Sequence, residues 1–230
     1  MYTSSLFSLP TTRDILIIVV AFLYTGLAIV LIKEIFKGSY ISKRRMTHIS
    51  MGVWPVFWLF FETWLAAVLV PLIVTLLLAF APEKFRQLFS RGDEKHIGLV
   101  IYALSFTVLT ALFYAPKGGQ PILGAPAIGA AGVFCLAFGD GIGGWIGRMY
   151  GRHRYKVPWA KEKSVEGSLG VFLTSLIFIY IASMMFPPVF SPVKIIIGAL
   201  VATILEGFSP AHSDNLFVPL GVAFALLLLP

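Results

Sequence analysis

The sequence predicts an all-α polytopic membrane protein with about eight transmembrane helices, and counts of seven to nine fit its pattern. Of the 230 residues, 58% are hydrophobic and 13% are charged, whereas a water-soluble domain of this size needs far more polar residues to cover its surface. The hydrophobic residues form runs long enough to cross a bilayer, and the basic residues collect between them. We therefore expect one integral, multi-pass transmembrane domain over residues 1–230.

Eight apolar runs give the expected helices. The first is too long for the apolar core of a signal peptide and has no small-residue cleavage pattern. The second is short unless its helix begins near Thr47, and the eighth is short as well. Pro187 and Pro188 stop the sixth. In order, the runs cover Ile15 to Ile32, Met51 to Phe61, Trp64 to Ala81, Ile97 to Ala115, Ala127 to Tyr150, Gly167 to Phe186, Val193 to Phe208 and Leu216 to Leu229.

The basic residues predict which side of the membrane each loop faces. Fifteen of the 18 lysines and arginines lie in the loops after the first, third and fifth runs or, for Arg148, at the end of the fifth run, and the other three are Arg13, Lys117 and Lys194. Short loops rich in lysine and arginine stay in the cytoplasm. The N-terminus is then outside, and the loop after the seventh run, with Asp214, faces the cytoplasm too.

Charge and cysteine content exclude some classes of protein. Cys135 is the single cysteine, so no intramolecular disulfide can form. The net charge of +7 comes from loops beside the membrane, where topology and anionic lipid headgroups explain it, so we expect no nucleic acid partner. The sequence shows no convincing internal repeat, which argues against a transporter built from inverted repeats.

Asp140 is the main functional candidate. It lies within the fifth apolar run, where a carboxylate is costly and therefore indicates a function. Asp140, Gly144, Arg148 and Arg152 step by four, which predicts one shared helix face. Asp140 and Arg148 are two turns apart, about 12 Å along the axis, so a bound cation or a polyphosphate fits between them better than a direct ion pair.

Glycines at positions 139, 143, 147 and 151 form a second stripe on the same helix. Small residues at every fourth position let a neighbouring helix approach closely, and such packing needs no ligand. A homodimer through this stripe is an open alternative. The segment GDGIGG also matches the dinucleotide fingerprint G-x-G-x-x-G, but that fingerprint needs a buried strand before it, so we set it aside.

The segment KSVEGS, residues 163–168, has the features of a phosphate site. It offers a cation at Lys163, hydroxyls at Ser164 and Ser168, and a helix N-terminus, where free amide groups and the helix dipole favour an anion. The alternative is a plain helix start with Ser164 as its cap. Glu166 fits better beside a divalent metal that bridges carboxylate and phosphate.

Glu206 and Asp214 are further acids near the same predicted membrane face. Glu206 could instead extend toward the membrane interface, and Asp214 could cap the last helix. Arg44 and Arg45 are explained equally well by the charge rule for cytoplasmic loops. Together, carboxylates, basic clusters and glycine-rich turns on one face are what metal-assisted phosphoryl transfer requires.

Four segments together resemble a known family. They are RRMTH (residues 44–48), FGDGIGGWIGRMYG (138–151), KSVEGS (163–168) and the tail from EGFSP to DNLFVPL (206–220). The combination resembles the membrane-embedded CTP-dependent lipid kinases, which comprise polyprenol, dolichol and diacylglycerol kinases. Its order and spacing are most similar to the phytol kinase branch. The resemblance covers the chain from about residue 43 to its end.

The resemblance implies a reaction and a place for it. It implies transfer of the γ-phosphoryl group of CTP, or UTP, to the hydroxyl of an isoprenoid alcohol such as phytol, farnesol or geranylgeraniol, which gives a prenyl monophosphate. It implies essential roles for Arg44, Arg45, Asp140, Gly141 and Gly144. It also implies a plasma or thylakoid membrane, with the reaction on the cytoplasmic or stromal face.

The residues and the resemblance lead to one hypothesis, a kinase with Mg²⁺ as cofactor and CTP as phosphoryl donor. Its expected partners are membrane lipid, an isoprenoid alcohol, the nucleotide and, as an open alternative, a second copy of the chain. Asp140, Arg148 and Lys163 are the expected catalytic residues, with Asp140 favoured as the general base.

A phosphatidate-cytidylyltransferase-like enzyme and a cation-coupled transporter are the alternatives to the kinase. The expected nucleotide contacts are Arg44, Arg45, Gly141, Gly144, Lys163, Ser164, Gly167 and Ser168, and the expected metal ligands are Asp140, Glu166, Glu206 and Asp214.

Overall fold

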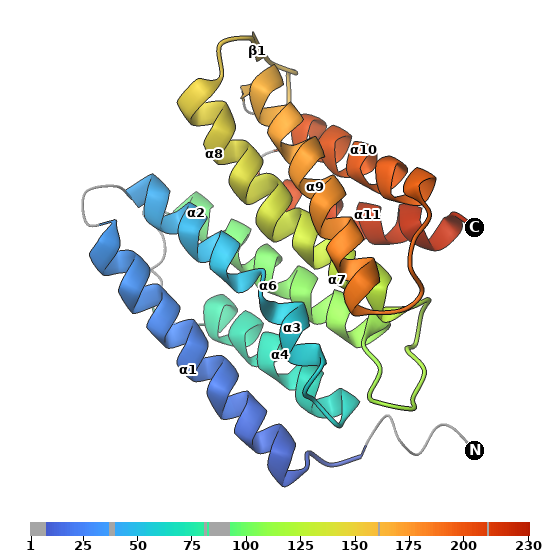
Figure 1. The fold of residues 1–230 in the computed structure, drawn as a ribbon. Coiled ribbons are helices and arrows are strands. Elements are labelled where there is room, and N and C mark those ends of the chain that lie inside the picture. Colours follow the sequence, from blue (N-terminus) through green and yellow to red (C-terminus); the bar gives the residue numbers. More distant parts are fainter. Residues whose placement is uncertain (1–7, 37–39, 81, 83–92, 161, 211) are drawn as a thin grey trace. The chain divides into compact units, whose positions relative to one another are not determined.

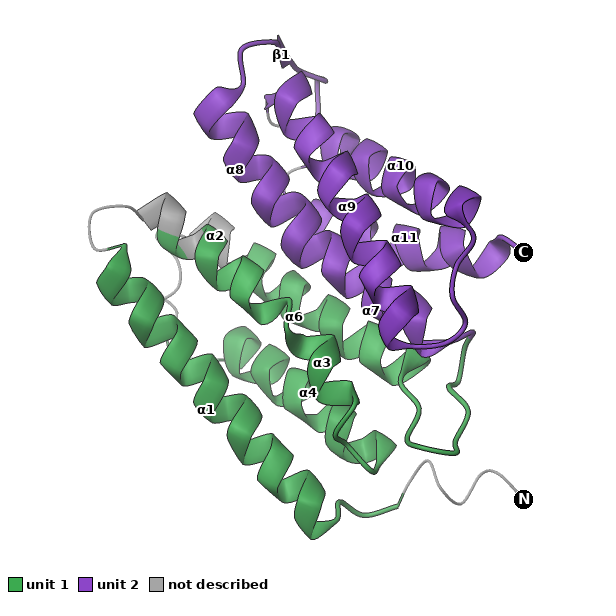
Figure 2. Ribbon diagram, viewed as in Figure 1, with its two compact units in different colours: residues 1–123 green, residues 124–230 purple. Residues whose placement is uncertain are grey.

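Helices form nearly all of the regular structure in the computed structural model, which describes residues 8–36, 40–80, 82, 93–160, 162–210 and 212–230 (Figure 1). The expected helical class is confirmed, with one two-stranded hairpin added. The helices group into two compact units, Met1–Leu123 and Gly124–Pro230 (Figure 2). The boundary follows the PKGGQP turn and lies at Gly124, whose φ of +58° is a conformation that glycine adopts without strain.

Unit 1 keeps three of the four expected spans as single helices and divides the other. In place of a continuous helix from Met51 to Phe61, the chain forms a polar helix, a turn and a five-residue helix, so this expectation was wrong. Gly52 and Val53 form the turn, and Pro55 has no amide hydrogen with which to continue a helix. The helices in the described part of unit 1 are α1 (Thr12–Ile35), α2 (Tyr40–Met51), α3 (Trp54–Trp58), α4 (Trp64–Phe80) and α6 (Asp93–Phe113).

The divided segment still returns the chain across unit 1. The hydroxyl of Thr63, just before α4, donates to Asp14 in the first turn of α1 at 2.8 Å, so α1 and α4 begin at the same end. The hydroxyl of Tyr114, just after α6, donates to the carbonyl of Phe61 at 2.8 Å, so α6 ends there too. The α2–α3 segment therefore occupies the place of a second crossing. Which side of a membrane each end faces stays a prediction.

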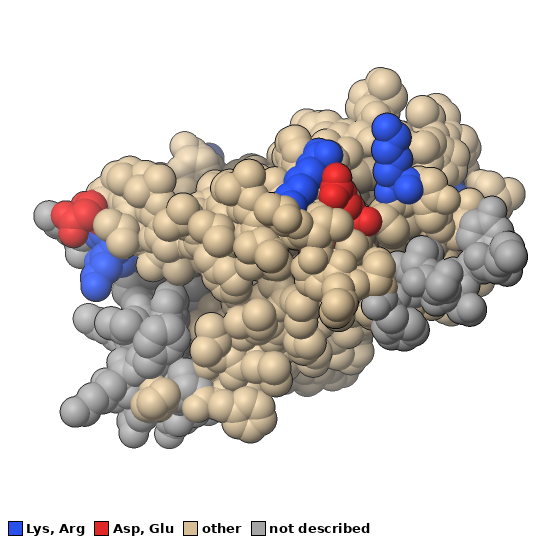
Figure 3. Space-filling model, turned by 90° about the horizontal axis from the view of Figure 1, so that it is seen from below, with Lys and Arg blue, Asp and Glu red and all other residues tan. Residues whose placement is uncertain are grey.

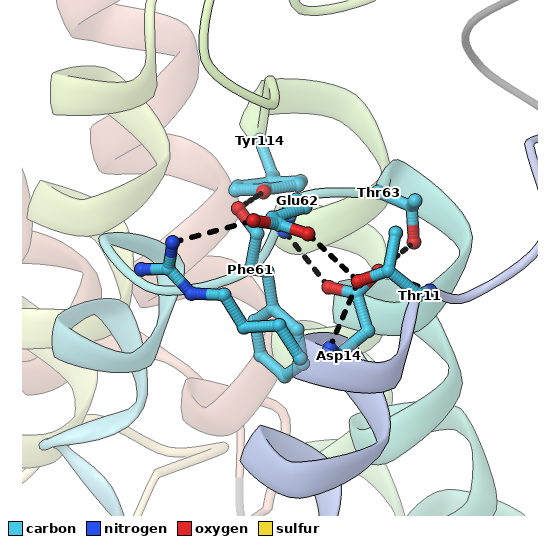
Figure 4. Close-up of polar contacts among 7 residues, drawn as sticks. Thr11, Asp14, Phe61, Glu62, Thr63 and Tyr114 are labelled. Carbon is cyan, nitrogen blue, oxygen red and sulfur yellow. Dashed lines mark hydrogen bonds and ion pairs between the residues drawn. The ribbon is translucent and has the colours of Figure 1, made fainter.

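A buried carboxylate fastens the starts of α1 and α4 together (Figure 4). Asp14 is fully buried and accepts from the amides of Thr11 and Glu62 at 3.0 and 2.8 Å and from the hydroxyl of Thr63. Thr11 also caps α1 by accepting from the amide of Asp14 at 3.1 Å. Arg13 pairs with Glu62 at 3.3 Å on the exposed side of this cluster. Sequence analysis did not select Asp14, and these contacts give it a structural role.

We expect Asp14→Asn to lower the free energy of unfolding by about 2 kcal/mol. The asparagine keeps the shape but turns an NH₂ group toward donors that Asp14 now accepts. Thermal unfolding of the purified protein in detergent measures the effect. Arg13→Ala is the control, because an exposed ion pair contributes about 0–1 kcal/mol. An equal loss of unfolding free energy in both variants would contradict the stabilising role of the hydrogen bonds to Asp14.

Unit 2 is an antiparallel bundle with one hairpin at its end. The fifth expected span is one long helical segment with three parts, and α9 follows it after a hairpin in which Arg154 pairs with Ser164 and Tyr155 with Lys163. The expected spans six to eight match α9 to α11 to within two residues at each end. The elements are α7 (Pro126–Phe134), the π-helical turn η1 (Cys135–Asp140), α8 (Gly141–Tyr150), β1 (Arg154–Tyr155), β2 (Lys163–Ser164), α9 (Val165–Met185), α10 (Pro192–Phe208) and α11 (Asp214–Leu228).

The glycine stripe packs against α9, as expected for close helix contact. A Cβ atom added at Gly143 would lie 2.6 Å from the amide nitrogen of Val171, and one added at Gly139 would lie 2.6 Å from the hydroxyl of Ser175. Real Cβ atoms do not come this close, so Gly143, which faces a backbone atom, must be glycine, whereas a side chain at position 139 would force Ser175 to shift. Because α9 covers the stripe, a homodimer would need a different surface.

The outer surface of several helices is strongly apolar. On α1, Leu23 and Leu27 are 67% and 60% exposed, and a water-soluble protein does not leave such rows of leucine in water. Figure 3 shows a face on which charged groups occupy only a few places. Among the described residues, three helices are long and apolar enough to cross a membrane: Thr12–Ile35, Pro126–Tyr150 and Val165–Met185. The chain is a membrane protein.

Candidate active site

Asp140 ends the π-helical turn η1, inside the long helix of unit 2. Such wide turns are rare and recur at functional sites, because the extra residue disturbs the regular backbone bonding. Cys135, Leu136 and Ala137 in this turn are fully buried, whereas Asp140 is partly exposed. The turn thus sets the acid at the end of a packed segment of the helix.

The hairpin after α8 places Lys163 over the ends of other helices. Its ammonium group pairs with the carboxylate of Glu206, near the end of α10. The two side chains are 22% and 4% exposed. Lys163 and Glu206 also interact electrostatically with Asp140 and with Asp214, at the start of α11. Four residues predicted for the site are therefore brought together, from four separate parts of the chain.

These acids control the protonation of Lys163. Burial acts to lower the pKa of Lys163, but the carboxylates of Glu206, Asp140 and Asp214 outweigh it and raise that pKa above its ordinary value. The ammonium form is therefore held at neutral pH. Since three carboxylates face one ammonium, the cluster carries a formal excess of two negative charges.

This charge excess suits a divalent cation. Within the described ranges, no three His, Cys, Asp or Glu side chains are arranged to enclose an ion by themselves. Mg²⁺ in phosphoryl-transfer sites takes one or two carboxylates and completes its coordination with phosphates and water. Asp140 and Asp214 fit that pattern, because Glu206 is already paired with Lys163.

Glu166, another expected metal ligand, has a partner of its own. Its carboxylate contacts Nδ1 of His153 at 2.7 Å and accepts from the amide of His153 at 3.2 Å. The amide of Val165 in turn donates to the carbonyl of His153 at 2.9 Å. These bonds tie the first turn of α9 to the hairpin, so the geometry assigns Glu166 to the fold of the hairpin.

Within KSVEGS, some residues are buried in helix capping and packing and others remain partly accessible. Ser164 is 3% exposed and caps α9 by accepting from the amide of Gly167 at 3.1 Å. Gly167 packs on α8, since a Cβ atom there would lie 2.9 Å from Cα of Gly147. The alternative of a plain helix cap therefore holds for Ser164. Ser168 is part-buried and shares a 2.7 Å hydrogen bond with the hydroxyl of Tyr155.

The other expected site residues belong to α8, to the segment that follows it, or to unit 1. Arg148 is exposed in the last turn of α8. The helix ends at Tyr150, so Arg152 does not continue the face that Asp140 and Arg148 were expected to share. Gly141 is buried and Gly144 is half-buried in α8. Arg44 and Arg45 belong to α2 of unit 1.

Two aromatic residues of the hairpin were not foreseen as parts of the site. The indole nitrogen of Trp159 donates to the carbonyl of Phe208, at the end of α10, at 2.8 Å. The ring of Tyr155 lies near Phe208, and a Cβ atom at Gly207 would lie 2.6 Å from its hydroxyl. They hold the hairpin over α9 and α10. Tyr155 and Trp159 lie in a polar loop of the sequence, and no local pattern there predicts contacts with α9 and α10.

We expect Lys163→Met to lower the free energy of unfolding by about 3 kcal/mol, because it leaves the buried carboxylate of Glu206 without its cation. Adding Glu206→Gln should restore most of that loss. Lys156→Met, an exposed lysine of the same hairpin, is the control and should change little. Thermal unfolding in detergent of these three variants and of Glu206→Gln alone measures the coupling, and additive effects of the two site changes would contradict it.

The chain is similar to a curated protein of known name. It is 32% identical over 211 residues to a protein named phytol kinase from Synechocystis sp., and the alignment covers 87% of this chain and 85% of that protein. No protein-family model matches the chain. No solved structure matches it either.

Proposed function

Because the chain belongs to the phytol kinase family, we propose that it transfers the γ-phosphoryl group of CTP, or UTP, to an isoprenoid alcohol. The alcohol is phytol, farnesol, geranylgeraniol or a relative of these, and the products are the prenyl monophosphate and the nucleoside diphosphate. That the chain is a kinase acting on a prenyl alcohol rests on its similarity to the Synechocystis relative. The nucleotide and the alcohol are our proposal.

One observation in the structure supports this proposal most strongly. Lys163 pairs with Glu206 in unit 2, and both interact electrostatically with Asp140 and Asp214, although up to 74 positions separate these four residues in the sequence. The packing of a helix bundle by itself favours apolar contacts between helix ends. Bringing several carboxylates near one lysine costs desolvation and repulsion free energy, which a bound ligand can offset. Phosphoryl transfer needs such a set of charges, because positioning and electrostatic stabilisation provide most of its catalysis.

The residues take separate parts in the reaction. The ammonium of Lys163 contacts a phosphate oxygen of the nucleotide, and Glu206 keeps that ammonium charged and oriented. A carboxylate of the cluster that is free of metal, with Asp140 favoured, accepts the proton of the alcohol as the alcohol oxygen bonds to the γ-phosphorus and the bond to the diphosphate breaks. Arg148 stabilises the charge that develops on the leaving phosphates, and Ser168, Gly141 and Gly144 line the phosphate path.

Asp140 and Asp214 would hold Mg²⁺, which when bound supplies positive charge to the nucleotide phosphates. Arg44 and Arg45 are proposed to contact the nucleotide as well, as the family resemblance implies. The apolar helices suit the other substrate, since an alcohol with a long hydrocarbon chain partitions into the bilayer. A kinase for it gains by working at the membrane face.

The test uses the purified full chain in lipid nanodiscs with Mg²⁺, γ-labelled CTP and phytol. Label recovered in the lipid fraction as a monophosphate supports the proposal. Parallel reactions with UTP and ATP identify the donor, and farnesol and geranylgeraniol identify the acceptor range. Label released as pyrophosphate would point to a cytidylyltransferase. Turnover of no alcohol with any nucleotide would reject a prenyl alcohol kinase and leave a cation-coupled transporter to be tested.

A further inference from the structure

The helices of unit 1 line a partly open cavity, and no residue of the charge cluster of unit 2 belongs to its wall. Its volume is about 620 Å³, within the range of roughly 300–1,000 Å³ that is typical of small-molecule sites. Residues from α1, α2, α3, α4 and α6 line it, so all the helices described in unit 1 contribute a wall.

The wall of this cavity presents mostly carbon atoms. Polar side chains in it direct their hydrogen bonds into the protein: the hydroxyl of Tyr24 donates to the carbonyl of Ser50 at 2.7 Å, and the indole nitrogen of Trp54 donates to the hydroxyl of Thr110 at 2.9 Å. Because these polar groups already have hydrogen-bond partners within the protein, they do not require a polar ligand in the cavity. The cavity therefore favours an apolar occupant along most of its length.

One end of the cavity is cationic. Lys33 lies in the last turn of α1, and Lys43 and His48 lie on α2, which follows it. From Ala21, deep in the wall, to Lys33 the cavity follows α1 for twelve residues, about 18 Å along the axis. An apolar space of this length with lysines at one end matches a hydrocarbon chain that carries a polar or anionic head.

We propose that this cavity is a binding site in unit 1 for the isoprenoid alcohol and its monophosphate, with the hydrocarbon chain along the cavity and the head group near Lys33 and Lys43. The inference rests on the proposed function, which it deepens by assigning the chain of the substrate to unit 1. The phosphorylated product carries negative charge, so the two lysines hold it more tightly than the alcohol. The distribution of basic loops predicts this end to face the cytoplasm, where a nucleotide is available.

Gly26 provides the sharpest variant. It lines the cavity, and a Cβ atom added there meets nothing within 4 Å, so a larger side chain enters open space rather than a packed contact. Gly26→Phe should fill part of the cavity and raise KM for phytol more than tenfold, with a smaller change for the shorter alcohol geraniol. Leu27→Phe is the matched control, because its side chain points outward and is 60% exposed.

A binding measurement separates this inference from the kinase activity itself. A phytol analogue with a diazirine near the far end of its chain is photocrosslinked to the full chain in nanodiscs of phosphatidylcholine. Peptide mapping should find the adduct on α1, α4 or α6, unlabelled phytol should compete, and Gly26→Phe should reduce labelling at least fivefold. Ala103→Leu, which narrows the cavity from α6, should do the same if Gly26→Phe fails to elute as folded protein.

Each outcome has a distinct meaning. Normal turnover of phytol with an unchanged KM in Gly26→Phe and Ala103→Leu would overturn the inference and leave the proposed function intact. Labelling that phosphatidylcholine prevents as well as phytol does would identify a general lipid site, which also overturns it. Absence of kinase activity together with phytol-specific labelling of the cavity would support the binding site and reject the reaction.

Discussion

Asparagine at position 140 is expected to slow phosphoryl transfer by at least about a hundredfold. The amide has nearly the shape of the carboxylate but accepts no proton and gives a divalent cation a much weaker ligand. Asp140 ends the wide turn of the long helix in unit 2 and interacts with Lys163 and Glu206. Its loss therefore affects charge in the cluster and leaves the helix packing as it is.

Initial rates with labelled nucleotide and phytol measure this effect, and elution volume and thermal unfolding report whether the variant folds. Glu162→Gln is the matched control, because it removes an exposed carboxylate that adjoins Lys163 in sequence. It should keep near-normal turnover. If Asp140→Asn also turns over normally while folded, Asp140 is a structural residue and the roles proposed for the cluster fail.

The second large effect is expected at the glycine stripe. Gly143→Leu should prevent α8 from packing on α9, because even the first side-chain atom would lie 2.6 Å from the backbone nitrogen of Val171. A backbone atom in a helix cannot move aside as the end of a side chain can. Overpacking usually costs about 1–3 kcal/mol, and a backbone clash in the central contact of unit 2 should exceed that.

Gly26→Leu is the matched control for this variant. Both glycines lie in long helices, but Gly26 has open space where Gly143 has Val171. Gly26→Leu should fold and gain up to about 1 kcal/mol from better helix propensity. The yield of monodisperse protein after detergent extraction compares the two. Equal yields would show that α8 and α9 can separate at little cost, and would refute the tight contact.

Most of the helices could be predicted because each one is a local pattern. Runs of apolar residues between Ile15 and Ile32 or between Val193 and Phe208 need no knowledge of the rest of the chain. The segment from Met51 to Phe61 was predicted wrongly because its apolar residues extend across a turn. Hydropathy does not register that Gly52 and Pro55 interrupt the backbone hydrogen bonds.

The candidate site was predicted in its residues but only partly in its arrangement. Asp140, Lys163, Glu206 and Asp214 were each chosen for their chemistry and predicted membrane face. That Lys163 pairs with Glu206 depends on how α9 and α10 pack, and no local pattern records a contact over 43 positions. The role of Asp14 was missed for the same reason, since its partners Glu62 and Thr63 lie about 50 positions along the chain, just before α4.

The wide turn from Cys135 to Asp140 also sets the angular register of everything that follows it. A regular helix turns about 100° per residue, so one residue held in a wider turn rotates α8 relative to α7 by roughly that angle. Contacts on both sides of the turn depend on this register: α7 packs against α9 and α11, and the glycines of α8 pack against α9. Deleting one residue in this turn would tighten it into a regular helix and misalign the two surfaces, although no contact residue had changed.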